Sequence, residues 1–386
     1  MKNVKTTVKP TTKEELRKLI LDTIKNEGNE CDLNFIDTSL ITDMLNLFYD
    51  MRDFNGKISD WDVSNVEDMN SMFFNALTFN QPLDKWDVSK VTDMCSMFFN
   101  ALTFNQPLDT WDVSNVTDMA CMFYQAESFN QPLNTWNVSK VTDMNSMFDH
   151  AYLFNQPLEN WDVSNVIDMC SMFNHATWFN QPLNKWNVSK VETMCYMFDH
   201  AKSFNQPINS WDVSNVTDMH GMFYYAESFN QPLNSWNVSN VTIMSGMFSN
   251  ALTFNQPLDN WDVSNVTGMA FMFADTETFN QPLDKWDVSN VTSMCGMFDH
   301  AKSFNQPINS WNVAKSEIMN CMFYHAVAFN QPLDKWDVSN VGDMYRMFFN
   351  AESFNQQLDK WQVTDRTVTS DMFVGSNLKS LPEWFR

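Results

Sequence analysis

Carboxylates recur in this chain at one position, directly after a regularly spaced tryptophan. Aspartates stacked in neighbouring copies of that position would repel one another, so such a row favours cations or hydrogen bonds from nearby Ser and Asn. Calcium sites need about six to eight oxygen ligands, and the glycine-rich nonapeptide of calcium-binding β-rolls is absent from the sequence. We therefore interpret the row as a solvated acidic stripe. It comprises Asp62, Asp87, Asp112, Asp162, Asp212, Asp262, Asp287 and Asp337.

Histidines form a second group that could do chemistry. Imidazoles stacked in consecutive copies of a repeat could share a Zn²⁺ or Ni²⁺ ion. Elsewhere the same position holds Asn, Gln or Tyr, so variation among exposed polar residues explains the histidines at least as well. We predict no metal site, no cofactor and no catalytic residue. The group contains His150, His175 and His200, with Asp149 and Asp199 beside them, and also His300 and His325.

A 25-residue repeat positions all of these residues. The segment FNQPLDKWDVSKVTDMCSMFFNA at 79–101 recurs as FNQPLDTWDVSNVTDMACMFYQA at 104–126. A fixed period of this length is typical of a solenoid, in which each coil buries its apolar face against its neighbours. The register is marked by Trp61, Trp86, Trp111, Trp136, Trp161, Trp186, Trp211, Trp236, Trp261, Trp286, Trp311, Trp336 and Trp361.

Apolar spacing within one repeat predicts the structure of a coil. The alternation Leu83-x-x-Trp86-x-Val88 favours a short strand with Asp87 and Ser89 on the solvent side. The spacing of three and four from Met94 to Ala101 favours one or two helical turns. We predict an α/β solenoid, a right-handed superhelix of about fourteen coils that each contain a short parallel strand and a short helical turn.

The two ends of the chain differ from the middle, because an uncovered terminal coil would expose an apolar cross-section. Thr12-x-x-Glu15 is a capping box that opens an amphipathic segment, and Gly28 follows its end. We predict a disordered stretch at 1–11, a capping helix at 12–31, the solenoid at 32–376 and a C-terminal cap at 377–386. The apolar residues of that last cap are Leu378, Leu381, Trp384 and Phe385.

Composition restricts the function. The net charge is -23, and residues 32–386 carry 17 basic against 42 acidic side chains. Such a surface repels phosphate backbones and anionic lipid, which argues against nucleic acid and membrane partners. The chain contains seven cysteines, an odd number that does not form a disulfide framework. No secretory signal or apolar run long enough for a membrane helix is visible.

The unit WDVSNVTDM-x-x-MF-x-x-A-x-x-FNQPL is similar to a leucine-rich repeat. More closely, it resembles the BspA-like leucine-rich-repeat surface proteins, a bacterial repeat first described as a mycoplasma lipoprotein-associated domain of unknown function. The resemblance covers roughly residues 32–376. It implies a surface or secreted protein that binds a host or partner protein, in some members as an adhesin. This chain shows no signal peptide or anchor, which leaves a cytoplasmic location open.

We predict a monomeric, non-enzymatic protein-binding or adhesion module, with a purely structural spacer as the alternative and a polysaccharide-active enzyme less favoured. Two surfaces compete for the partner. One is the array of outward Asp and Ser side chains on the predicted concave strand face, and the other is a lateral aromatic patch. The candidate partner-binding residues are Asp87, Ser89, Asp112, Ser114, Asp162, Ser164, Asp212, Ser214, Tyr124 and Tyr224.

Overall fold

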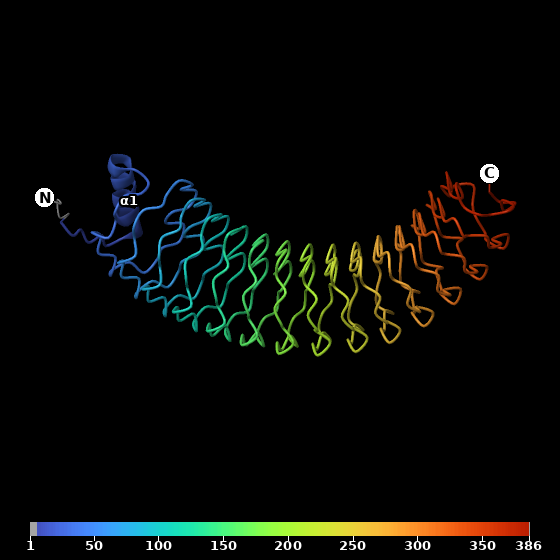
Figure 1. The fold of residues 1–386 in the computed structure, drawn as a ribbon, viewed down its shortest axis with the longest axis horizontal. Coiled ribbons are helices and arrows are strands. Elements are labelled where there is room, and N and C mark those ends of the chain that lie inside the picture. The colour runs from blue at the N-terminus through green and yellow to red at the C-terminus, as the bar shows by residue number, and fades with distance from the viewer. Residues whose placement is uncertain (1–5, 386) are drawn as a thin grey trace. The chain divides into compact units, whose positions relative to one another are not determined.

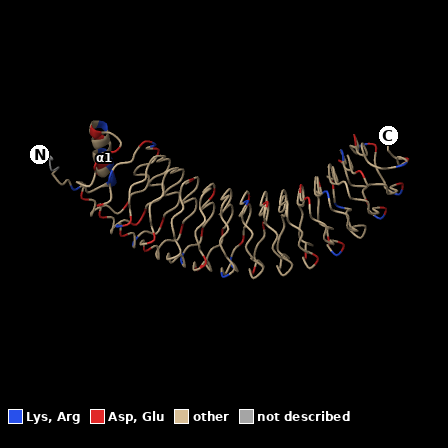
Figure 2. Ribbon diagram, in the orientation of Figure 1, with Lys and Arg blue, Asp and Glu red and all other residues tan. Residues whose placement is uncertain are grey.

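The computed structural model describes residues 6–385 and divides the chain into two compact units, Met1–Lys190 and Val191–Arg386. We call them the first and the second unit and treat each by itself. In both units, successive coils lie side by side (Figure 1). Acidic side chains recur from coil to coil in each unit (Figure 2).

One helix, α1, precedes the coils of the first unit and spans Lys13–Glu27. The Thr12 side chain accepts a hydrogen bond from the Glu15 amide at 3.2 Å, as the capping box predicts. The Glu15 carboxylate turns back to the amide and hydroxyl of Thr11, at 2.8 and 2.9 Å. The helix ends at Gly28, whose φ of 88° suits a residue without a Cβ.

Helix α1 packs against the first coils. Leu16 and Ile20 are completely buried, and the Arg17 guanidinium donates to the carbonyl oxygens of Asn46 and Leu47 at 2.9 and 2.6 Å. Of the stretch predicted to be disordered, residues 1–5 lie outside the described residues, and Val8 forms a parallel bridge with Ile36. Within residues 6–385, no helix has the length and apolar content needed to cross a bilayer.

The coils differ from the predicted strand and helical turn. In the described chain after Glu27 there is no further helix, and parallel pairing occurs as isolated bridges. Apart from Val8–Ile36 and Asp32–Lys57, these bridges lie at the position of Asp93. At Leu83–Val88 a turn closes instead, with the Trp86 amide on the Leu83 carbonyl. The bridge residues are Asp43, Asp68, Asp93, Asp118, Asp143 and Asp168 in the first unit, and Thr193, Asp218, Ile243, Gly268, Ser293, Ile318, Asp343 and Val368 in the second.

The segment predicted to be helical, residues 94–101, is instead the place where coils bond to one another. The amides of Met94, Ser96 and Phe98 donate to carbonyls of the next coil at 3.1, 2.8 and 2.9 Å. The Met97 amide turns back to the Met94 carbonyl at 3.2 Å. Ser96 and Asn100 both have a φ of 55°, in the left-handed region. The apolar spacing of three therefore arises from consecutive turns with alternating backbone handedness.

The core consists of aromatic rows that run from coil to coil. Trp61 and Trp86 stack with ring centroids 6.5 Å apart and planes 2° apart, and Trp86 is 3% exposed. The Trp86 indole N–H donates to the Ile58 carbonyl oxygen at 3.2 Å, so each buried indole has its partner in the preceding coil. Phe98 packs on Phe104 at 4.0 Å. The in-register stacking predicted from the tryptophans is confirmed within each unit.

Asparagines link the coils on another side. The Asn80 Oδ1 accepts the Asn105 amide and the Gln106 side-chain amide, both at 3.0 Å. The pair repeats in both units, for example where Asn255 accepts from Asn280 at 3.0 Å. The Asn-Gln dipeptides of these FNQP turns thus satisfy polar groups in the neighbouring coil of the same unit.

The C-terminal residues cover the last coil. Trp384 stacks on Trp361 at 6.1 Å and donates its indole N–H to the Leu358 carbonyl at 2.9 Å. Phe385 packs edge-on against Phe373 at 5.1 Å. Leu381, predicted to cover the coil, is 57% exposed, and the next residue, Pro382, is buried in its place.

Candidate functional site

The predicted Asp and Ser residues form one surface in each unit, which we call the Asp–Ser face. The Asp87 carboxylate accepts the Ser89 amide at 3.1 Å, and Asp112 accepts the Ser114 amide at 3.0 Å. The side-chain hydroxyl and then the amide of Ser114 lower the pKa of Asp112. Each carboxylate therefore closes a local turn while its exposed side stays in water. The pairs Asp162–Ser164 and Asp212–Ser214 have the same geometry, both at 3.1 Å.

A second row of carboxylates lies at the bridge position. Asp118 accepts the Ala120 amide at 2.9 Å, and its charge is close to those of Asp93 and Asp143. Burial, and after it these like charges, raise the pKa of Asp118. Burial also raises the pKa of Asp68 and Asp168. The like charges of this row repel one another in the first unit. Each carboxylate nevertheless accepts a hydrogen bond from a backbone amide of its own turn.

The second unit contains a surface cavity of about 720 Å³, which we call the aromatic pocket. It lies on the segments that correspond, in the 25-residue repeat, to residues 94–101 of the first unit. Gly221 and Gly246 form its floor at a repeat position that other coils fill with Ser96, Cys121 or Ser146. Two neighbouring coils therefore lack a side chain there, although both glycines are buried, Gly221 beneath the Tyr196 ring. The pocket is lined by Tyr196, His220, Gly221, Tyr224, Tyr225, Ser245, Gly246, Ser249, Asn250, Ala270, Phe271, Ala274, Asp275 and Asp299.

Two rings at the ends of the pocket depend on glycines. A Cβ on Gly221 would lie 2.5 Å from the Tyr196 ring, so that ring occupies the space above the glycine. Phe271 covers Gly296 in the same way and is 43% exposed. Both glycines have positive φ, 58° and 57°, which Gly adopts without a steric penalty. The Tyr196 hydroxyl lies 2.7 Å from His220 Nε2, which holds that ring in position.

Carboxylates give the pocket a negative side. Burial, and more weakly the charge of Asp275, raise the pKa of Asp299 to about 6, although the His300 contact opposes the shift. Asp299 Oδ1 lies 2.6 Å from His300 Nδ1. Asp275 is half-buried beside it. Aromatic faces next to carboxylates attract cations, through the ring quadrupole and through charge.

Comparison with known proteins assigns the family. The model for "Mycoplasma protein of unknown function, DUF285" matches residues 20–136, 122–231, 158–257, 206–294 and 278–384. The chain belongs to the DUF285 family. The overlapping matches agree with a repeat solenoid, while the narrower resemblance to BspA-like surface proteins stays a prediction.

Other comparisons are more distant. No curated protein matches this DUF285 chain. Among solved structures, an internalin (inlF) of Listeria monocytogenes is 12% identical, with a TM-score of 0.26 over 78% of this chain and 81% of the internalin. A chain of the TLR13–ssRNA13 complex is 8% identical, with a TM-score of 0.20 over 90% of this chain and 68% of the other. At these scores neither similarity bears on the function of the DUF285 chain.

The two predicted tyrosines of the DUF285 chain lie in different surroundings. Tyr124, in the first unit, ends a row of stacked rings, with its centroid 4.3 Å from that of Phe99. Tyr224, in the second unit, lines the aromatic pocket. Sequence reasoning missed Gly221, Gly246 and Phe271. A signal was present, because four of the eight glycines fall within residues 221–296.

Proposed function

We propose that this protein is a non-enzymatic interaction module that binds a protein partner, and that the aromatic pocket receives a basic side chain of that partner. The observation that carries the proposal is the pocket itself. It lies where glycines interrupt a regular repeat, and it combines exposed ring faces with carboxylates.

Charge complementarity favours a lysine or arginine as the occupant. The chain has a net charge of -23, and Asp275 and Asp299 line the pocket. A cation over an aromatic face gains about 0.5–2 kcal/mol, more when water is excluded. The Asp–Ser face favours the same partner chemistry, because its exposed carboxylates add negative potential that attracts a basic peptide.

The test uses the full chain and three glycine–serine peptides that carry lysines, arginines or glutamates. Binding is measured by calorimetry at low and at high salt. We expect saturable binding of the two basic peptides, weaker at high salt because mobile ions screen exposed charges, and none of the acidic one. If no basic peptide binds, the proposal is wrong, and a purely structural spacer becomes the favoured function. Release of sugar from a polysaccharide by the chain would favour an enzyme instead.

Variants separate the pocket from the Asp–Ser face. Tyr224→Ala and Asp275→Asn should each weaken binding of the lysine peptide about tenfold, since each removes a contact to the cation worth roughly 1–2 kcal/mol. Tyr124→Ala is the matched control, because it removes the equivalent tyrosine from the first unit, and it should leave the affinity unchanged. A loss of affinity in Asp112→Asn, with Tyr224→Ala behaving as the parent, would move the binding site to the Asp–Ser face.

A further inference from the structure

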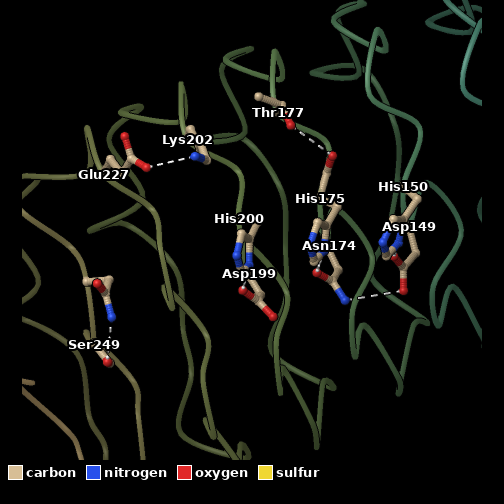
Figure 3. Close-up of polar contacts among 11 residues, drawn as sticks. Asp149, His150, Asn174, His175, Thr177, Asp199, His200, Lys202, Glu227 and Ser249 are labelled. Carbon is tan, nitrogen blue, oxygen red and sulfur yellow. Dashed lines mark hydrogen bonds and ion pairs between the residues drawn. The ribbon is translucent and has the colours of Figure 1, made fainter.

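Tyr225 turns one of its two ring faces toward the aromatic pocket. The His200 ring covers the other face, with centroids 4.4 Å apart and planes 14° apart. Asp199 holds His200 in place, since its Oδ1 lies 2.5 Å from His200 Nδ1 (Figure 3). Tyr224 stands at 75° to Tyr225 with centroids 4.7 Å apart, and it lies 5.8 Å from His200. A ring on the far face of Tyr225 would lie much farther from His200, so Tyr224 flanks the stack and does not cover that face.

The space in front of the Tyr225 ring is set by the coil spacing. The Tyr225 amide donates to the Ser249 carbonyl and the Asn250 amide to the Ala274 carbonyl, both at 2.8 Å. Asp275, the equivalent of Tyr225, is therefore two coils away, at roughly 10 Å. Between them, the Asn250 side-chain amide turns to the Ser249 hydroxyl at 3.2 Å (Figure 3). A cation halfway would lie about 5 Å from the ring, within the roughly 6 Å reach of a cation–π contact.

Two of the polar groups that line the pocket already have partners. Asp299 Oδ1 lies 2.6 Å from His300 Nδ1, and the Tyr196 hydroxyl lies 2.7 Å from His220 Nε2. A lysine ammonium carries three N–H donors, and each needs an acceptor when the ammonium leaves water. A trimethylated ammonium keeps the charge but has no N–H group. It loses less on leaving water, and its methyl groups contact ring faces directly.

We propose that the aromatic pocket selects a trimethylated lysine of the protein partner over an unmodified one. This selection rests on the proposed function, since it specifies which basic side chain the pocket receives. Tyr225 offers its ring face to the methyl groups, Phe271 adds an apolar wall that is 43% exposed, and Asp275 supplies negative charge. Gly246 has no side chain and leaves room at the floor for a head bulkier than an ammonium.

The experiment compares glycine–serine peptides that differ only at one central residue, measured by calorimetry on the full chain. That residue is lysine, trimethyl-lysine or the uncharged analogue in which carbon replaces the ammonium nitrogen. Trimethyl-lysine should bind about tenfold more tightly than lysine and than the uncharged analogue, which has the same shape without the charge.

The outcomes separate this selection from the proposed function. Binding of the lysine peptide that equals or exceeds that of the trimethyl-lysine peptide would overturn the selection and leave the proposed function standing. An uncharged analogue that binds as tightly as trimethyl-lysine would also overturn the selection, because apolar burial alone would then explain it. If none of the peptides binds, both are wrong.

Gly246→Ser tests the pocket through its floor. Ser96 and Ser146 occupy this repeat position with φ values of 55° and 53°, so serine is compatible with the fold. A Cβ on Gly246 would lie 3.8 Å from the Tyr224 ring, an ordinary contact. The variant should weaken trimethyl-lysine binding about tenfold by filling the floor. Gly342→Ser is the matched control, because its Cβ would also make a contact of 3.8 Å, and it should bind as the parent. Equal affinities of the two variants would contradict the proposal.

Tyr225→Leu tests the ring face. Leucine keeps an apolar side chain but has no ring quadrupole, so the preference for trimethyl-lysine over lysine should disappear. Thermal unfolding checks that this variant and both glycine variants are folded. An unchanged preference in folded Tyr225→Leu would overturn the role of the ring.

Choline and phosphocholine distinguish the source of the quaternary ammonium group. Both are added as competitors of the trimethyl-lysine peptide. Choline should displace the peptide at high concentration, whereas phosphocholine should displace it less well, because the net charge of -23 repels its phosphate. Phosphocholine that binds more tightly than the peptide would overturn the proposal and identify a lipid headgroup as the ligand.

Discussion

Single residues in this protein are chosen by backbone conformation as much as by packing. In nearly every coil, the positions of Ser96 and Asn100 have positive φ, and the chain fills them with Ser, Cys, Asn, His, Gln, Asp, Tyr, Phe, Arg or Gly, none of them β-branched. A β-branched side chain would be strained in this region. The same positions carry the glycines of the aromatic pocket and the stacked histidines His150 and His175. The residue type at these positions varies, but only among residues that a left-handed backbone accepts.

Ser146→Gly should stabilise the first unit by about 0.5–1 kcal/mol. Ser146 has a φ of 53°, and Gly removes the strain of a left-handed Cβ, although it costs more chain entropy on folding. Gly246 already occupies the equivalent position in the second unit. Urea unfolding measures the change, with Ser146→Val as the opposite case. A stability lower than that of the parent in Ser146→Gly would contradict the argument.

Trp111→Phe should destabilise the protein by about 2–3 kcal/mol, because the buried Leu83 carbonyl loses the indole N–H that lies 3.0 Å away and a cavity opens. Trp384→Phe is the matched comparison at the end of the chain. It removes a similar bond to Leu358, at 2.9 Å, from a half-buried ring, so its effect should be smaller. Urea denaturation followed by fluorescence measures the free energy of unfolding of both variants. Equal losses would contradict the view that burial between coils causes the larger effect of Trp111→Phe.

At the scale of elements, the coil is a succession of three-residue turns that bond to the next coil only at alternate amides. In the described coils neither a helix nor a strand forms, because left-handed residues reverse the direction of the peptide groups before either can continue. Helix α1 is the exception. It has a capping box at one end and a glycine at the other, and its buried face covers the first coils.

Leu16→Asp combined with Ile20→Asp should detach α1 and expose the apolar end of the first coils. Both side chains are fully buried, so two charges there cannot be accommodated without leaving the interface. We expect concentration-dependent self-association, measured by light scattering coupled to gel filtration. Leu21→Asp is the control on the other face of the helix, where Leu21 is 47% exposed. If the double variant stays monomeric, α1 does not protect the first coils.

At the scale of the whole molecule, acidic charge opposes folding near neutral pH. The carboxyls of Asp68, Asp118 and Asp168 have pKa values raised mainly by burial, and that of Asp299 is raised to about 6. A group whose pKa is higher in the folded state binds more protons when folded, so stability falls as pH rises through that pKa. The net charge of -23 adds repulsion in the same direction.

We therefore expect a higher melting temperature at pH 5 than at pH 8. Below about pH 4 the trend should reverse, because carboxyls with lowered pKa values lose their hydrogen bonds, among them Asp112 and also Asp37, whose pKa is about 2. Differential scanning calorimetry across this range measures the effect. Repeating it in high salt separates the two causes, since salt screens surface repulsion but not burial. A melting temperature that rises steadily to pH 8 would contradict the prediction.

Much of this molecule follows from the spacing of its residues. The 25-residue period, the in-register row of Trp and the capping box of α1 are all visible in the sequence, because a repeat stacks identical side chains in register. The tertiary structure decided the backbone of the coil. An apolar spacing of three fits either a helix or consecutive turns. Consecutive turns form here because amides such as that of Ser96 donate hydrogen bonds to carbonyls of the next coil. The aromatic pocket likewise depends on contacts between coils, because the glycines at 221–296 mark its place but the rings of Tyr196 and Phe271 lie over glycines of the next coil.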